Sequence, residues 1–177
     1  DRFVYQDLDG LEDLPPPRLK GIHQFENAST AIAALKHFGT GISSEAIAKG
    51  METVTWPARM QPLPGLLQDM LISGSDLWLD GGHNVAGAQV LAQALGDLND
   101  KQSKPLTLIL GMLGNKDVEG YLSCFEGLAK RVITVPVPAD DLTTNAGTSP
   151  QDLADLAIKH GFAATHTQSV QEALKLV

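Results

Sequence analysis

From residue 77 onward, segments typical of buried strands alternate with segments typical of amphipathic helices. The strands are expected at residues 77–79, 106–110, 132–135 and 162–167. The helices are expected at residues 85–98, 118–130, 150–160 and from 169 onward. Strand–helix repetition at this spacing requires crossover connections, which produce a mainly parallel sheet with helices on both faces. The later part of the chain is therefore predicted to be a Rossmann-like α/β domain.

Residues 1–54 show a different pattern. The stretch RFVYQD is typical of a strand, and LEDLPPPRLKG, with its three prolines, is interpreted as a loop. A helical apolar period runs from His23 to Phe38, and a second short helix is expected from Ser43 or Ser44 to Lys49. These pieces bury too little to fold alone, so we interpret them as the last portion of a larger domain. The proline-bearing stretch that follows is interpreted as a linker.

Composition excludes several classes of protein. Of the 177 residues, 43% are hydrophobic, which supports a real core, and the formal net charge of -8 argues against nucleic acid as the main partner. A single cysteine excludes an internal disulfide framework and a cysteine zinc cluster, and it fits a reducing, cytoplasmic setting. No apolar run approaches the roughly 20 residues of a membrane helix. Because the chain begins with Asp1 and stops near a helix, we expect a piece of a longer protein.

The stretch LDGGHN, residues 79–84, is the first candidate site. Asp80 comes at the carboxyl end of an expected strand, which is where open α/β sheets collect their ligands. The two glycines that follow allow a tight turn and a close approach of the backbone to a ligand. His83 and Asn84 could contact a phosphate or a carboxylate. The alternative is that Asp80 and Asn84 only cap the next helix, but this leaves the Gly-Gly-His between them unexplained.

The stretch GMLGNKD, residues 111–117, occupies the same position after the next strand and is the second candidate. Lys116 could hold a carboxylate or a phosphate as a point charge, or it could be a solvated lysine beside a helix cap. No GK[ST] sequence occurs in the chain, so the stretch is not a phosphate-binding P-loop. The histidine spacing gives no metal motif, so no metal ligand is expected among these residues.

Four stretches in this order carry a family resemblance. They are HQFENASTAIAAL, WPARMQ, LDGGHN and GMLGNKD. Together they resemble folylpolyglutamate synthase/dihydrofolate synthase, a member of the Mur ligase superfamily. The resemblance implies that residues 1–54 are the end of a P-loop ATPase domain, 55–63 a hinge linker, and 64–177 the C-terminal ligase domain. It also implies that the complete enzyme is longer, monomeric and cytoplasmic, whereas the 177-residue chain could self-associate.

The resemblance also implies a reaction and residue roles. ATP, with magnesium held by residues upstream of this chain, phosphorylates the carboxylate of dihydropteroate or a folate, and the amine of glutamate attacks the acyl phosphate. Asn27 would contact the adenine and Arg59 the nucleotide phosphates. Asp80 would bind the ribose or position the arginine. His83, Asn84 and Lys116 would bind glutamate, with His83 and Lys116 near the transferred phosphoryl group.

The sequence departs from the family pattern in four places. Gly82, Val85 and Asn115 stand where the family often has alanine, proline and an acid, and the stretch between Arg59 and Asp80 is longer than in many members. Two other interpretations remain open: a module that binds a nucleotide or an acidic metabolite without catalysis, and the C-terminal domain of a cell-wall Mur ligase. The DGGHN turn favours the folate branch.

Overall fold

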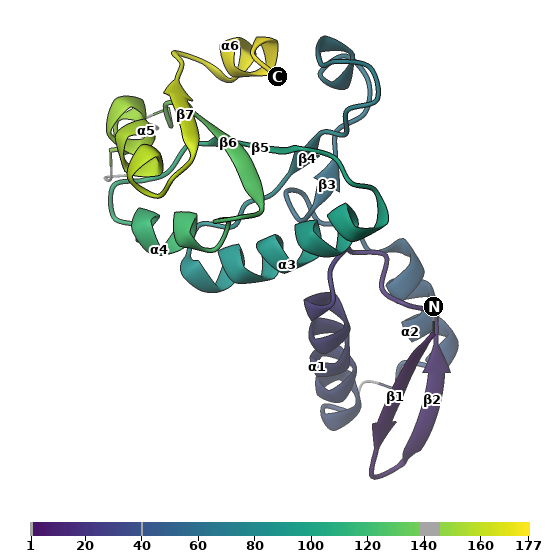
Figure 1. Cartoon of the computed structure of the whole chain (residues 1–177). Helices are drawn as coiled ribbons and strands as arrows, with labels where there is room; N and C mark the ends of the chain where they lie inside the picture. The colour runs from purple at the N-terminus through teal and green to yellow at the C-terminus, as the bar shows by residue number, and fades with distance from the viewer. Residues whose placement is uncertain (1, 40, 139–145) are drawn as a thin grey trace. The chain divides into compact units, whose positions relative to one another are not determined.

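The structure is a computed structural model that describes residues 2–39, 41–138 and 146–177. It divides the chain into two compact units, Asp1–Gln61 and Pro62–Val177. Figure 1 shows the elements of both. The loop expected around residues 138–150 lies in part outside the described residues.

The first unit consists of a hairpin and two helices. Its elements are β1 (Phe3–Asp7), β2 (Gly10–Leu14), α1 (His23–His37) and α2 (Ser44–Thr53). The interpretation of LEDL as a loop was wrong, because β2 pairs with β1 in antiparallel register from Phe3↔Leu14 to Asp7↔Gly10. The prolines begin only after Leu14, so they end the strand and do not prevent it.

A small apolar core holds this unit together. It contains the buried residues Phe3, Tyr5, Leu14, Ile32, Ile47 and Met51. Ser43 caps α2 by accepting from the Ala46 N–H at 3.2 Å. The predicted end at Lys49 was wrong, because α2 continues through Gly50 to Thr53 and buries Met51 on its last turn. Core burial outweighs the cost of roughly 1 kcal/mol for a glycine inside a helix.

The second unit contains a three-stranded parallel sheet in the order β5-β6-β7. Its strands are β5 (Leu106–Leu110), β6 (Ala129–Thr134) and β7 (Ala163–His166). The mainly parallel α/β fold is confirmed. The expectation that the strand near residue 78 joins this sheet was wrong, since β4 (Trp78–Leu79) pairs instead with β3 (Gln61–Pro62) in a separate two-stranded sheet.

Among the described residues, this unit has four α-helices and one short 3-10 helix, η1 (Gln68–Met70). The α-helices are α3 (Val85–Lys101), α4 (Val118–Ser123), α5 (Pro150–Lys159) and α6 (Val170–Lys175). The helix expected over 118–130 is much shorter than predicted. Gly127 has a left-handed φ of 78°, which ends any continuous helix, and β6 already begins at Ala129. Ser149 and Ser169 cap α5 and α6.

Helices cover both faces of the parallel sheet. Successive strand residues point to opposite faces, so each strand supplies side chains to both layers of helices. On one face, Leu110 and Val132 pack with residues of α3, α4 and α5 around the fully buried Phe125. On the other face, Ile133 packs with Ala173 of α6. This two-sided core fixes the strand ends, from which the loops of the candidate site leave.

Candidate functional site

The turn between β4 and α3 is ordered by its own side chains. The Asp80 carboxylate accepts a hydrogen bond from the Gly82 N–H at 2.8 Å. Asn84 is the N-cap of α3, with its Oδ1 accepting from the Gly87 N–H at 2.8 Å. The exposed His83 lies between these two bonds, and its Nδ1 is 3.2 Å from the Gly81 carbonyl oxygen. Asn84 is therefore the N-cap of α3, whereas the bond to Asp80 orders the turn before it.

The loop after β5 is held from both sides. The Gly114 N–H donates to the Ala146 carbonyl at 3.0 Å, and the Lys116 N–H donates to the carbonyl of Leu113 at 3.2 Å. Directly after Lys116, the Asp117 carboxylate caps α4. The backbone of the lysine is thus fixed at the carboxyl end of β5.

These two segments line one pocket of about 290 Å³. Its lining residues are His83, Gly111, Met112, Leu113, Lys116 and Val137. Two residues predicted to share a site, His83 and Lys116, are therefore brought to one pocket. An ammonium group and an imidazole beside an apolar wall suit a small molecule that carries a carboxylate or phosphate.

The Asp80 carboxylate also acts on a buried tyrosine of α4, Tyr121. Burial raises the pKa of Tyr121 to about 12, and the nearby Asp80 carboxylate acts in the same direction. The Tyr121 hydroxyl therefore remains protonated at neutral pH. This places a buried neutral phenol within the electrostatic influence of the Asp80 carboxylate.

Asn27 and Arg59 belong to the first unit. Asn27 is exposed on α1, and its Nδ2 donates to the Gln24 Oε1 at 3.2 Å. Arg59 is exposed and lies between two residues with left-handed backbone, Ala58 (φ 52°) and Met60 (φ 41°). Non-glycine residues rarely adopt this conformation, and such residues cluster at functional sites.

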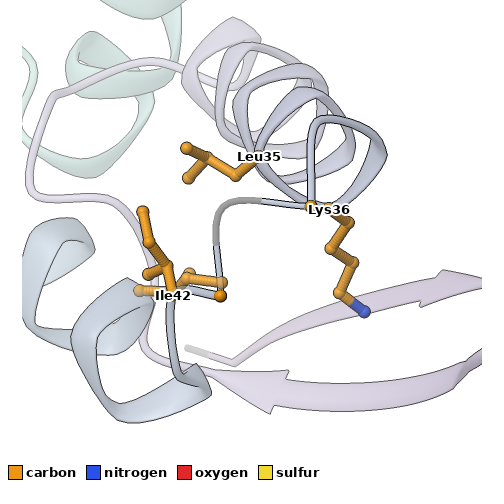
Figure 2. Close-up of a pocket in the computed structure, with 6 residues that line it drawn as sticks. Leu35, Lys36 and Ile42 are labelled. Carbon is orange, nitrogen blue, oxygen red and sulfur yellow. The ribbon is translucent and has the colours of Figure 1, made fainter.

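Figure 2 shows a second, smaller pocket of about 60 Å³ in the first unit. Leu35 and Lys36 of α1 and Ile42 of the following loop contribute to its lining. The Lys36 ammonium is already paired with Asp7 at 3.1 Å and with Glu12 at 2.6 Å. Because these two carboxylates already neutralise the Lys36 ammonium group, we assign no site to this pocket.

Sequence reasoning missed the apolar wall of the larger pocket. Met112, Leu113 and Val137 were not singled out, although Val137 follows β6 as Lys116 follows β5. The carboxyl ends of parallel strands meet at one edge of a sheet, so this rule could have located Val137. No sequence signal identifies the antiparallel bridge from Leu113 to Gly147, which holds the loop.

The described residues contain neither a metal-binding cluster nor a membrane-spanning helix. Within residues 2–39, 41–138 and 146–177, no three or more His, Cys, Asp or Glu side chains are grouped as a metal ion would require. In the same part of the chain, no helix is both long and apolar enough to span a bilayer.

Comparison with known proteins gives a consistent result. The family model described as "Mur ligase, glutamate ligase domain" matches residues 59–177. The dihydrofolate synthase/folylpolyglutamate synthase of Mycobacterium tuberculosis is 30% identical over 81% of this chain and 27% of its own length. The folylpolyglutamate synthase of Lacticaseibacillus casei is 33% identical over 77% of this chain and 30% of its own. The chain thus spans less than a third of either relative.

Solved structures extend the match to nearly the whole chain. Folylpolyglutamate synthase of M. tuberculosis, complexed with ADP, superposes with a TM-score of 0.74 and 26% identity over 94% of this chain and 35% of that one. The folylpolyglutamate synthase of Thermotoga maritima gives a TM-score of 0.73 and 29% identity. This match covers 99% of this chain and 38% of the Thermotoga chain.

Proposed function

The chain belongs to the Mur ligases, whose glutamate ligase domain it carries over residues 59–177, and we propose that it forms part of a folate ligase. In that reaction glutamate is joined to dihydropteroate, to a folylpolyglutamate, or to both. The relatives at 30% and 33% identity carry these activities in their names, which favours the folate branch over the cell-wall branch. We place the reaction in the cytoplasm, with ATP and a divalent metal as cofactors.

The observation that carries this proposal is the shared pocket of His83 and Lys116. In our proposal Lys116 pairs with a carboxylate of glutamate, and His83 lies where the amine and the activated carboxyl group meet. Asn84 uses its Oδ1 as a helix cap, so its Nδ2 is the group that would contact the substrate. Met112, Leu113 and Val137 form the apolar wall beside these groups.

ATP supplies the phosphoryl group that activates the acceptor carboxylate. We assign Asn27 to the adenine, Arg59 to the phosphates and Asp80 to the ribose. The described residues fit this group in part: Arg59 and Lys116 offer positive charge, and Asn27 offers an exposed amide. They do not fit a magnesium ion, because this part of the chain groups no set of suitable ligands. The proposal therefore assigns no metal ligand within these residues.

The test is a titration of the isotope-labelled chain with L-glutamate, followed by NMR. We expect saturable shifts in the backbone amides at residues 82–85 and 111–117. Lys116→Ala should weaken binding by about 5- to 20-fold, as expected for a lost charge-assisted hydrogen bond. Lys130→Ala is the matched control, because Lys130 is an exposed lysine near the amino end of β6. Unchanged affinity in Lys116→Ala would remove the basis of the proposal.

A further inference from the structure

A buried amide lies at the start of α1. The Gln24 side chain is only 5% exposed, in a helix whose other buried residue is Ile32. Its Nε2 is 2.7 Å from the Nε2 of His23, and its Oε1 accepts from the Nδ2 of Asn27 at 3.2 Å. A single buried carboxamide thus joins a histidine on one side to an exposed asparagine on the other.

Helix capping does not explain this arrangement. The N-cap of α1 is Ile22, which offers no side-chain cap bond. Both hydrogen bonds of the Gln24 amide go to side chains and not to the free N–H groups of the first turn. A buried amide is costly unless it is hydrogen-bonded, whereas methionine would fill a similar volume without that requirement. The polarity of Gln24 therefore calls for a role beyond packing.

The histidine end of the cluster is held in place. Gly21 has a left-handed φ of 105°, and a Cβ at this position would overlap the ring of His23. The ring therefore packs directly on the Gly21 backbone. Because Gln24 uses its oxygen for Asn27, its NH₂ group must donate to the Nε2 of His23, which acts as the acceptor.

We infer that Gln24 is a positioning residue that fixes the carboxamide of Asn27, so that the Asn27 carbonyl oxygen is presented outward to an N–H donor on a bound base. The Nδ2 of Asn27 is engaged inward, so the oxygen remains as the outward group. This inference rests on the proposed contact of Asn27 with the nucleotide base. It deepens that proposal by assigning the orientation of the amide and the residue that sets it.

The fixed orientation of the Asn27 carboxamide predicts which class of purine the chain prefers. A 6-aminopurine presents an N–H donor to an outward carbonyl oxygen, whereas a 6-oxopurine presents a second acceptor at the same place. A fixed acceptor should therefore favour adenosine over inosine. A freely rotating asparagine would turn its NH₂ group toward the oxo group and lose this preference.

Three variants of the full chain test the inference. Gln24→Met removes both hydrogen bonds at similar volume. Gln24→Glu keeps an acceptor for the Asn27 Nδ2, and its other oxygen accepts from His23 once the ring carries its proton on Nε2. Gln6→Met, at an exposed position of β1, is the matched control. The first readout is the side-chain amide signal of Asn27 by NMR, which needs no ligand.

We expect the Asn27 amide signal to move toward its unfolded-chain position in Gln24→Met and to stay in Gln24→Glu and Gln6→Met. In titrations, Gln24→Met should bind adenosine about 5- to 10-fold more weakly, and the wild type should prefer adenosine over inosine by a similar factor. An unmoved Asn27 signal in folded Gln24→Met overturns the positioning role. If Gln24→Met does not fold, loss of the signal position in Gln24→Glu overturns it.

Failure of the base contact has a different signature. If adenosine leaves the wild-type Asn27 signal unchanged, the assignment of Asn27 to a base is wrong, and with it the ligand part of this inference. The effect of Gln24→Met on the same signal then decides the positioning role by itself.

Discussion

At the scale of single residues, His83 and Asn84 are neighbours with different physical roles. Asn84 holds the first turn of α3 through its bond to Gly87, whereas the His83 side chain is exposed at the pocket and contacts its own turn. The sequence predicted both in one site and left capping as the alternative. The structure assigns capping to Asn84, and the lining of the pocket to His83.

This difference predicts opposite mutant behaviour. Asn84→Ala should cost about 1 kcal/mol of stability, which corresponds to a fall of about 3 to 5 °C in the midpoint of thermal unfolding. His83→Ala should change the midpoint by less than about 1 °C, because exposed side chains contribute little, yet it should weaken glutamate binding. Calorimetry and a glutamate titration on both variants give the answer. A stable Asn84→Ala variant would mean that the cap is dispensable.

Lys36 determines a second residue-scale property, the acid stability of the first unit. Its hydrogen bonds lower the pKa of Asp7 and of Glu12 below their ordinary values. A carboxylate with a lowered pKa stabilises the fold above its ordinary range of about 4 and loses this contribution as the pH falls through the lowered value. Lys36→Met should therefore be less stable than the wild type near pH 7.

The stability difference between wild type and Lys36→Met should depend on pH. The gap in unfolding midpoint between wild type and Lys36→Met should be widest above about pH 5 and should shrink below about pH 4. Lys49→Met, an exposed lysine on α2, serves as the control and should show no such trend. A gap that stays constant from about pH 7 to about pH 3 would show that Lys36 acts by packing and not by charge.

At the scale of elements, local patterns predicted most helices and strands, and tertiary contacts decided the rest. The starts of α2, α5 and α6 were predicted closely, because the caps that begin these helices, Ser43, Ser149 and Ser169, act locally. β2 was missed, because a charged LEDL sequence forms a strand only when β1 lies beside it. α4 was predicted too long, since the apolar spacing continues beyond Ser123 while the backbone turns toward β6.

The contact between α3 and α4 can be tested with two glycines. A Cβ at Gly120 would lie 2.5 Å from Asp117 Oδ2 and 2.7 Å from Val85 Cγ2. Gly120→Ala must therefore displace the α4 cap and the first turn of α3, at a cost of about 1–3 kcal/mol. Gly96→Ala, in the interior of α3 with open space around it, should gain about 0.5–1 kcal/mol. Denaturant unfolding of both variants tests this, and equal stabilities would contradict the close approach of the two helices.

At the scale of the whole molecule, the residues assigned to the reaction are divided between the two units. Asn27 and Arg59 belong to Asp1–Gln61, whereas Asp80, His83 and Lys116 belong to Pro62–Val177. The family resemblance predicted that His83 and Lys116 share a site. It could not predict the apolar wall, which depends on how three loops pack. The assignment of residues 1–54 to an ATP-binding domain and of 55–63 to a hinge stays a prediction.

The absence of a GK[ST] sequence predicts the activity of this chain by itself. We expect no ligation and no ATP hydrolysis above background when the 177 residues are assayed with ATP, dihydropteroate and glutamate. In our proposal the ligase domain supplies residues for glutamate, whereas the 177 residues contain no GK[ST] loop to cradle the nucleotide phosphates. Turnover at the rate of a complete ligase would show that these residues do not depend on such a loop.

The central claim is that a glutamate carboxylate binds between His83 and Lys116. The most direct measurement is a crystal structure of the chain soaked with L-glutamate. The account predicts density for glutamate in this pocket, with one carboxylate within hydrogen-bond distance of the Lys116 ammonium, and loss of that density in Lys116→Ala crystals. Glutamate bound at another place in the chain, or bound here unchanged in Lys116→Ala, would contradict it.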